Sequence, residues 1–158
     1  RVPLRRSAQR SGLTQALALM TEPNSCYAYF SAYGDDLDPL ALTQELGIAP
    51  TRAWRKGDLD PRRRERRTGQ WSLYSRLAKT AELEEHLNDV LLQLDANAQA
   101  FASVAERFNG TLQLVGNFND IGAGLNLPKS VVTRLAFYGL ELDLDSYYLY
   151  SDQRECTG

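Results

Sequence analysis

One structural plan occurs twice in this chain, and it is the feature that most constrains the fold. Each copy consists of a strand, a polar loop, a helix that begins at a proline, a glycine that ends the helix, and a second strand. The copies span residues 27–55 and 111–150. Proline is favoured at the first position of a helix and glycine just after the last one. The residues at these boundaries are Pro39, Gly47, Pro128 and Gly139.

Two β-α-β-like units around a helical insert predict an α+β fold. The expected fold is a single mixed or antiparallel sheet of about five strands, with helices packed mainly on one face. Alternation and turn residues predict strands at 26–33, 51–55, 69–75, 110–118 and 140–150. Apolar periodicity and capping residues predict helices at 39–46, 83–94, 97–108 and 128–138.

Length and composition favour one domain. A chain of 158 residues is typical of a single domain. Residues 1–19 contain several arginines, no acid and no structural period, so we expect a disordered N-terminal extension followed by one α+β domain at 20–158. No run approaches the roughly 20 apolar residues that a membrane helix needs, so no membrane span is expected.

The number and spacing of the cysteines bear on the cellular compartment of the protein. Cys26 and Cys156 are too few for a disulfide scaffold, and neither has the Cys/His spacing of a zinc site. A bridge between them is an alternative if the first and last strands pair, whereas separate thiols suit a reducing compartment. We therefore expect a cytoplasmic protein with no metal and no cofactor. The sequence leaves the oligomeric state open.

Positive charge is concentrated in one stretch, residues 52–67, which we call the basic segment. A hairpin with this charge is a candidate contact surface for an acidic protein partner, and nucleic acid is the less favoured partner. Asp58, Asp60 and Glu65 are interleaved with the cations, and a solvated loop without function is the competing interpretation. The candidate binding residues are Arg52, Arg55, Lys56, Arg62, Arg63, Arg64, Arg66 and Arg67.

A cleft near the turn at 35–38 is the alternative site. It would combine Asp35, Asp36 and Asp38 with His86, the only histidine in the chain, and serve a small ligand or an enzyme. The acids lack the spacing of a calcium loop, and Asp38 is also suited to cap the helix that follows. His86 is expected at the edge of the apolar stripe, bonded to a neighbour. No nucleophile motif is present, so catalysis is not favoured.

Two further stretches alternate along predicted strands. Glu141, Asp143 and Asp145 alternate with leucines, which predicts a half-exposed strand that faces basic side chains of its neighbour. Trp54 and Trp71 alternate as core residues do, rather than as a platform for stacking bases.

With these motifs in view, the chain resembles a bacterial family known as domain of unknown function 4279. The matching stretches are 33–39 (YGDDLDP), 46–48 (LGI), 50–58 (PTRAWRKGD), 69–73 (GQWSL), 83–87 (LEEHL) and 139–145 (GLELDLD). The resemblance covers about residues 27–150, and the run 34–58 is its specific part. It implies a small cytoplasmic α+β domain and supplies no catalytic residues.

The residues and the resemblance leave two classes of function open. The first is an interaction domain, of an immunity or regulatory type, that uses the basic segment or the acidic strand. The second is a small-ligand binder or enzyme that uses the cleft near the turn at 35–38. The absence of a recognisable catalytic constellation favours the first.

Deleting residues 1–19 is expected to leave the fold and its thermal stability almost unchanged, because the segment has no period with which to pack. A thermal melt of the truncated and full chains measures this. A fall in melting temperature of more than about 4 °C, roughly 1 kcal/mol at this size, would show that the segment packs on the domain.

Overall fold

A computed structural model describes residues 23–119 and 124–149, which form one mixed five-stranded sheet and a layer of helices. The predicted α+β class is therefore confirmed. Residues 1–19 and Cys156 lie outside the described residues, so the extension and the cysteine pairing stay predictions. The elements in chain order are β1 (Ser25–Gly34), α1 (Pro39–Leu46), β2 (Arg52–Trp54), β3 (Gly69–Tyr74), α2 (Leu83–Asp95), α3 (Ala98–Arg107), β4 (Thr111–Phe118), α4 (Lys129–Tyr138) and β5 (Glu141–Tyr148).

The strand order is β2-β3-β1-β4-β5, with β1 at the centre. β1 is antiparallel to both β3 and β4, β2 is antiparallel to β3, and β5 is parallel to β4. In the second repeated unit, β4 and β5 are therefore direct neighbours joined through α4. In the first, β3 separates β1 from β2. The two units share a plan but differ in where their second strand enters the sheet.

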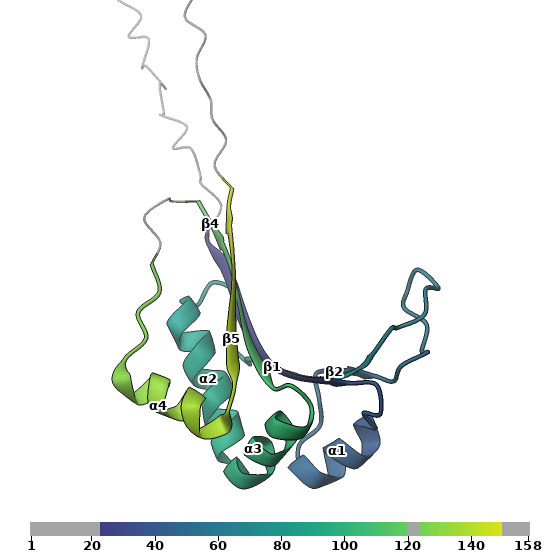
Figure 1. The fold of residues 1–158 in the computed structure, drawn as a ribbon. Coiled ribbons are helices and arrows are strands. Elements are labelled where there is room, and N and C mark those ends of the chain that lie inside the picture. Colours follow the sequence, from purple (N-terminus) through teal and green to yellow (C-terminus); the bar gives the residue numbers. More distant parts are fainter. Residues whose placement is uncertain (1–22, 120–123, 150–158) are drawn as a thin grey trace, which may run out of the picture.

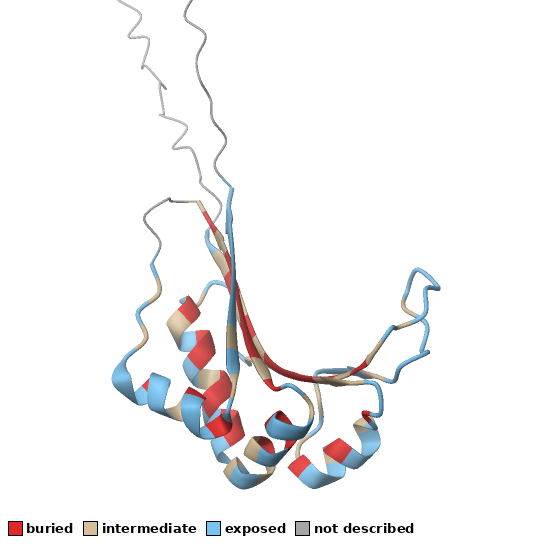
Figure 2. Cartoon of the chain, viewed as in Figure 1, coloured by how far each residue is buried: buried red, intermediate tan, exposed pale blue. Residues whose placement is uncertain are grey.

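The described helices lie on the convex side of a bent sheet, and no described helix lies on the concave side (Figure 1). Buried positions gather where the helices meet the sheet (Figure 2). Ala28, Phe30 and Ala32 of β1 point into this layer and are fully buried, because every second side chain of a strand lies on the same face. The expectation that helices pack mainly on one face is confirmed.

Local signals set the ends of α1 as predicted, whereas α4 begins one residue later than predicted, with Pro128 as its N-cap. The Asp38 carboxylate accepts a hydrogen bond from the Leu40 N–H at 3.0 Å, which caps α1 ahead of Pro39. Gly47 ends the helix with φ of 70°, a left-handed conformation that glycine adopts without steric cost. Within the described residues, no helix has both the length and the apolar character that crossing a membrane requires.

The two tryptophans lie on opposite faces of the sheet. Trp71 is fully buried under the helices, and its Nε1 donates to the Thr43 hydroxyl at 3.1 Å. Trp54 is aligned with Gln70, one position out of phase with Trp71, and is half-buried on the other face. The prediction that both belong to the core is thus wrong for Trp54. Alternation shows which residues share a face, but it does not show which face the helices cover.

Replacing Trp71 with alanine is expected to lower the free energy of unfolding by about 3–5 kcal/mol, because it removes a buried aromatic ring. Trp54→Ala is the matched control and should cost only about 1–2 kcal/mol, since that ring is partly exposed. Urea denaturation of both variants measures the difference. Equal losses would contradict the opposite placement of the two rings.

Candidate binding surface

The candidate binding surface is the sheet face that no described helix covers, which we call the open face. Tyr29 of β1 is aligned with Tyr74 of β3 on one side and with Gln113 of β4 on the other. Aligned residues share a face, so the registers extend this row across the sheet. The open face carries Arg52 and Trp54 on β2, tyrosines on β1 and β3, and Glu141, Asp143 and Asp145 on β5.

Three tyrosines form a stacked array at the centre of the open face. The ring centroids of Tyr29 and Tyr74 are 4.5 Å apart, and Tyr27 lies 6.3 Å and 6.1 Å from them. The Arg52 guanidinium lies 5.3 Å from the Tyr74 centroid, and the Lys79 amine lies 5.8 Å from that of Tyr27. Burial raises the pKa of both Tyr29 and Tyr74, so these phenols stay neutral. The array therefore offers aromatic surface with cations at its margins.

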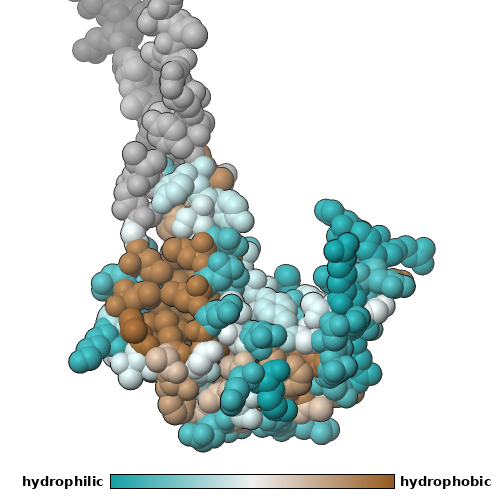
Figure 3. All heavy atoms as spheres, viewed as in Figure 1, coloured by the Kyte–Doolittle hydropathy of each residue, from teal (hydrophilic) through white to brown (hydrophobic). Residues whose placement is uncertain are grey.

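The loop between β2 and β3 is an ordered hairpin, and we call residues 58–67 the hairpin tip. Backbone bonds join Gly57 to Arg66 at 2.9 Å and Asp60 to Arg64 at 2.8 Å. The Asp60 carboxylate accepts from the backbone N–H groups of Arg62 and Arg64 and from the Arg64 guanidinium. These hydrogen bonds, above all the one from the Arg64 backbone N–H, lower the pKa of Asp60. Space-filling atoms show the hairpin as a hydrophilic projection (Figure 3).

The structure divides the cations of the basic segment into three groups. Arg55, Lys56 and Arg64 form ion pairs with Asp38, Asp35 and Asp60, respectively. Arg52 and Arg66 lie over the rings of Tyr74 and Trp54, with Arg66 at 4.1 Å. The remaining three are exposed, and none makes an ion pair within the described part of the chain; they are Arg62, Arg63 and Arg67.

The residues of the alternative cleft do not come together. Asp35 and Asp38 follow the end of β1 and hold Lys56 and Arg55, while Asp36 is exposed beside them. β1 ends at Gly34, which is aligned with Gly69 at the start of β3. His86 instead contacts Ser75, just beyond the other end of β3. The length of a strand separates the histidine from the three acids.

His86 is more deeply buried than the sequence predicts. Its side chain is 1% exposed, Nδ1 lies 2.5 Å from the Ser75 hydroxyl oxygen, and Nε2 has no hydrogen-bond partner among the described residues. Burial lowers its pKa below the usual 6.5. The nearby carboxylate of Asp89 binds Arg76 and Gln93. A neutral histidine bonded to a serine fits the predicted structural role.

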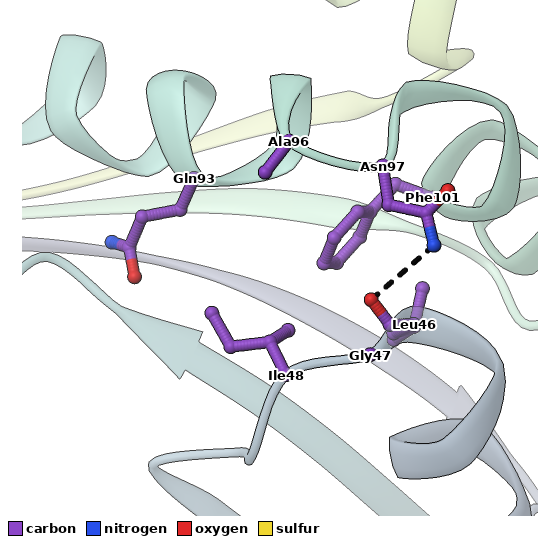
Figure 4. A pocket seen from close by; sticks show the side chains of 7 residues that line it. All are labelled: Leu46, Gly47, Ile48, Gln93, Ala96, Asn97 and Phe101. Carbon is purple, nitrogen blue, oxygen red and sulfur yellow. Dashed lines mark hydrogen bonds between the residues drawn. The ribbon is translucent and has the colours of Figure 1, made fainter.

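A small pocket opens between α1, α2 and α3 (Figure 4). Its two amide side chains already have partners: Gln93 donates to the Tyr74 carbonyl at 3.1 Å, and Asn97 to the carbonyls of Glu45 and Leu46 at 3.2 and 3.4 Å. These bonds join the helices to each other and to the sheet. The pocket is lined by Leu46, Gly47, Ile48, Gln93, Ala96, Asn97 and Phe101. It offers little chemistry to a ligand.

The acidic row, defined as Glu141, Asp143 and Asp145, lies on the open face of β5. Its neighbours on β4 are Thr111, Gln113 and Val115, and Gln113 donates to Asp145 at 3.2 Å. The predicted basic neighbour is therefore wrong, because the strand order places the basic segment at the opposite edge of the sheet. In the described ranges, no group of three or more histidines, cysteines and acids could hold a metal ion.

The tyrosine array is the part of the surface that sequence reasoning did not propose as a site. The alternation of Tyr27, Tyr29 and Tyr33 shows that they share a face of β1. Tyr74 joins them only through the pairing of β1 with β3. The signal that could have indicated a binding face is a strand with tyrosines on one face and small core residues on the other.

The chain belongs to the family described as domain of unknown function (DUF4279), whose model matches residues 24–149. The match covers nearly the whole described structure. No curated protein and no solved structure matches the chain.

The buried histidine is expected to make stability depend on pH. Because its pKa is lower in the folded state than in the unfolded one, the unfolded state binds more protons once the pH falls below about 6.5. The free energy of unfolding should therefore fall as the pH drops below about 6.5. His86→Gln should show a shallower fall in urea melts across that range. Parallel profiles would contradict the assignment.

Proposed function

We propose that this member of the DUF4279 family is a non-catalytic binding domain that contacts an acidic segment of a protein partner. The contact surface is the hairpin tip together with the adjoining β2–β3 side of the open face. A bacterial, cytoplasmic protein of an immunity or regulatory type fits this proposal.

The arginines of the hairpin tip carry the proposal. Arg62, Arg63 and Arg67 are exposed and have no ion pair among the described residues, whereas the neighbouring Arg64 is paired with Asp60. The Asp60 carboxylate and the cross-hairpin backbone bonds hold the turn in one shape. A preorganised turn loses little conformational entropy on binding, so its guanidinium groups are well placed for carboxylates.

The composition of the open face supports an interface. Tyrosine, tryptophan and arginine are enriched where proteins bind each other and supply most hot spots. Here Arg52 lies over Tyr74 and Arg66 over Trp54, so the aromatic surface and the positive charge occupy adjacent positions. An acidic segment that also carries apolar side chains could use both.

The competing functions have weaker support. An enzyme at the turn at 35–38 would need acids that are already paired with Arg55 and Lys56 and a histidine at the other end of β3. Single-stranded nucleic acid could use the cations and rings. Yet the tyrosine rings stack on one another within 15° of parallel, and the acidic row shares the same face. Both features disfavour stacked bases on a phosphate chain.

Reversing the three unpaired arginines is expected to weaken binding to an acidic peptide by about tenfold or more. The variant Arg62→Glu, Arg63→Glu, Arg67→Glu should keep its stability within about 0.5 kcal/mol, since these positions are exposed. The probe is a fluorescent peptide of alternating glutamate and phenylalanine, titrated at low and high salt. Binding should weaken as salt rises.

Lys129→Glu serves as the charge-reversal control, and the single variant Arg63→Glu is its match, because Lys129 is also exposed but lies at the start of α4. The control should bind the peptide like the native chain. Random single-stranded and duplex DNA are titrated in parallel. Tighter binding to either DNA than to the peptide, lost in the triple variant, would replace the protein partner with nucleic acid.

A further inference from the structure

The edge strand β5 is exposed along its outer edge and, at nearly every residue, on its two faces. Within the described residues it pairs only with β4, and its outer edge has no partner strand (Figure 1). All but one of its residues are exposed, the exception being the half-buried Leu142. An edge strand that is long and open is a template for pairing with another chain.

The hydrogen-bonding groups on the outer edge can be assigned from the pairing with β4. The Glu141 N–H donates to the Gly110 carbonyl at 3.1 Å, and the Leu149 N–H to the Phe118 carbonyl at 2.8 Å. Main-chain groups alternate in direction along a strand, so odd-numbered residues face β4 and even-numbered residues face outward. The N–H and C=O groups of Leu144 and Ser146 therefore point to the outer edge.

The two faces of β5 have different chemistry. The acidic row lies on the open face, while Leu142 and Leu144 lie on the helix face, and Leu144 is 41% exposed. Figure 3 shows an apolar area that extends over the segment before α4, α4 itself and the adjoining side of β5. Exposed or half-buried apolar residues in these elements include Leu125, Leu127 and Val132. A strand added at this edge would meet carboxylates on one face and aliphatic groups on the other.

We propose that the outer edge of β5 binds an extended segment of a partner protein in which basic and apolar residues alternate. Main-chain bonds to the outward groups would add the segment as a sixth strand, as in other cases of β-strand addition. Its basic side chains would face the acidic row, and its apolar side chains would extend the surface of Leu142 and Leu144. Period-two alternation in the partner matches period-two alternation in β5.

A second copy of the chain fits this edge less well. Antiparallel pairing of β5 with itself about a two-fold axis would align the two acidic rows on one face, and like charges opposite each other destabilise a pair of strands. Acidic residues are also a means of preventing edge pairing. That role accounts for the exclusion of a second copy but not for the exposed leucines and apolar area beside the strand.

Ser146→Pro tests the main-chain bonds directly. Ser146 is exposed and its N–H points outward, so proline removes a donor from the edge without removing a bond to β4. The probe is an eight-residue peptide of alternating lysine and valine, matched to the eight residues of β5 and followed by fluorescence anisotropy with the full chain. Ser146→Pro should weaken binding by about tenfold or more, and the control Ser146→Ala should leave it within about twofold.

Charge and register give independent readouts. Asp143→Lys should weaken binding of the lysine–valine peptide and strengthen that of a glutamate–valine peptide. N-methylation of the lysine–valine peptide at every second residue should abolish binding when it blocks the N–H groups that face β5. Methylation of the other set of alternate residues, whose N–H groups face away, should leave binding intact. Equal binding of the two N-methylated peptides, no effect of Ser146→Pro, or no binding up to millimolar peptide would overturn the proposal. Sedimentation that shows a dimer of the native chain, dissociated by Ser146→Pro, would overturn it in favour of a second copy.

Discussion

Packing among three aromatic rings is the interaction on which the rest of the structure depends. Phe30 of β1, Trp71 of β3 and Phe101 of α3 meet edge-to-face, with centroids 5.4–6.2 Å apart, and each is at most 1% exposed. This cluster fixes the helix layer to one face of the sheet. With no second layer among the described residues, the opposite face is covered by its own side chains. Ser31 and Ser72 are fully buried on the open face, where Ser31 donates to the Tyr33 hydroxyl at 2.8 Å and Gln70 donates to the Ser72 hydroxyl at 2.6 Å.

The strand order then determines where charge lies. β2 and β5 are the two edges, so the hairpin tip continues one edge and the acidic row lies on the other. A chain with a net charge of −2 thus presents a positive and a negative surface at opposite sides of the same open face. Segregation of this kind orients a charged partner as it approaches, which net charge alone would not do.

Local features of the fold could be predicted from sequence, whereas those that depend on strand order could not. Asp38, Pro39 and Gly47 act within one helix, so their positions alone predicted its two ends. Strand geometry likewise predicts that the neighbouring residues Tyr27 and Ala28 lie on opposite faces of β1. Trp54 was assigned to the core wrongly, because the alternation of residues does not show which face of the sheet the helices cover. The acidic row was assigned a basic neighbour because nothing local places β5 beside β4, and the burial of His86 depends on β3 reaching α2 through Ser75.

The two proposed surfaces would bind by different physics. The hairpin tip offers exposed guanidinium groups whose attraction acts over about a Debye length, so it would mainly accelerate encounter and would weaken with salt. The edge of β5 offers main-chain donors and acceptors next to exposed leucines, and such contacts form only after alignment and mainly slow dissociation. A single partner with an acidic stretch and a basic–apolar strand could use the first surface to approach and the second to stay. The hairpin and the edge of β5 border the concave face of the bent sheet on opposite sides (Figure 1), so such a partner would cross the tyrosine array between them.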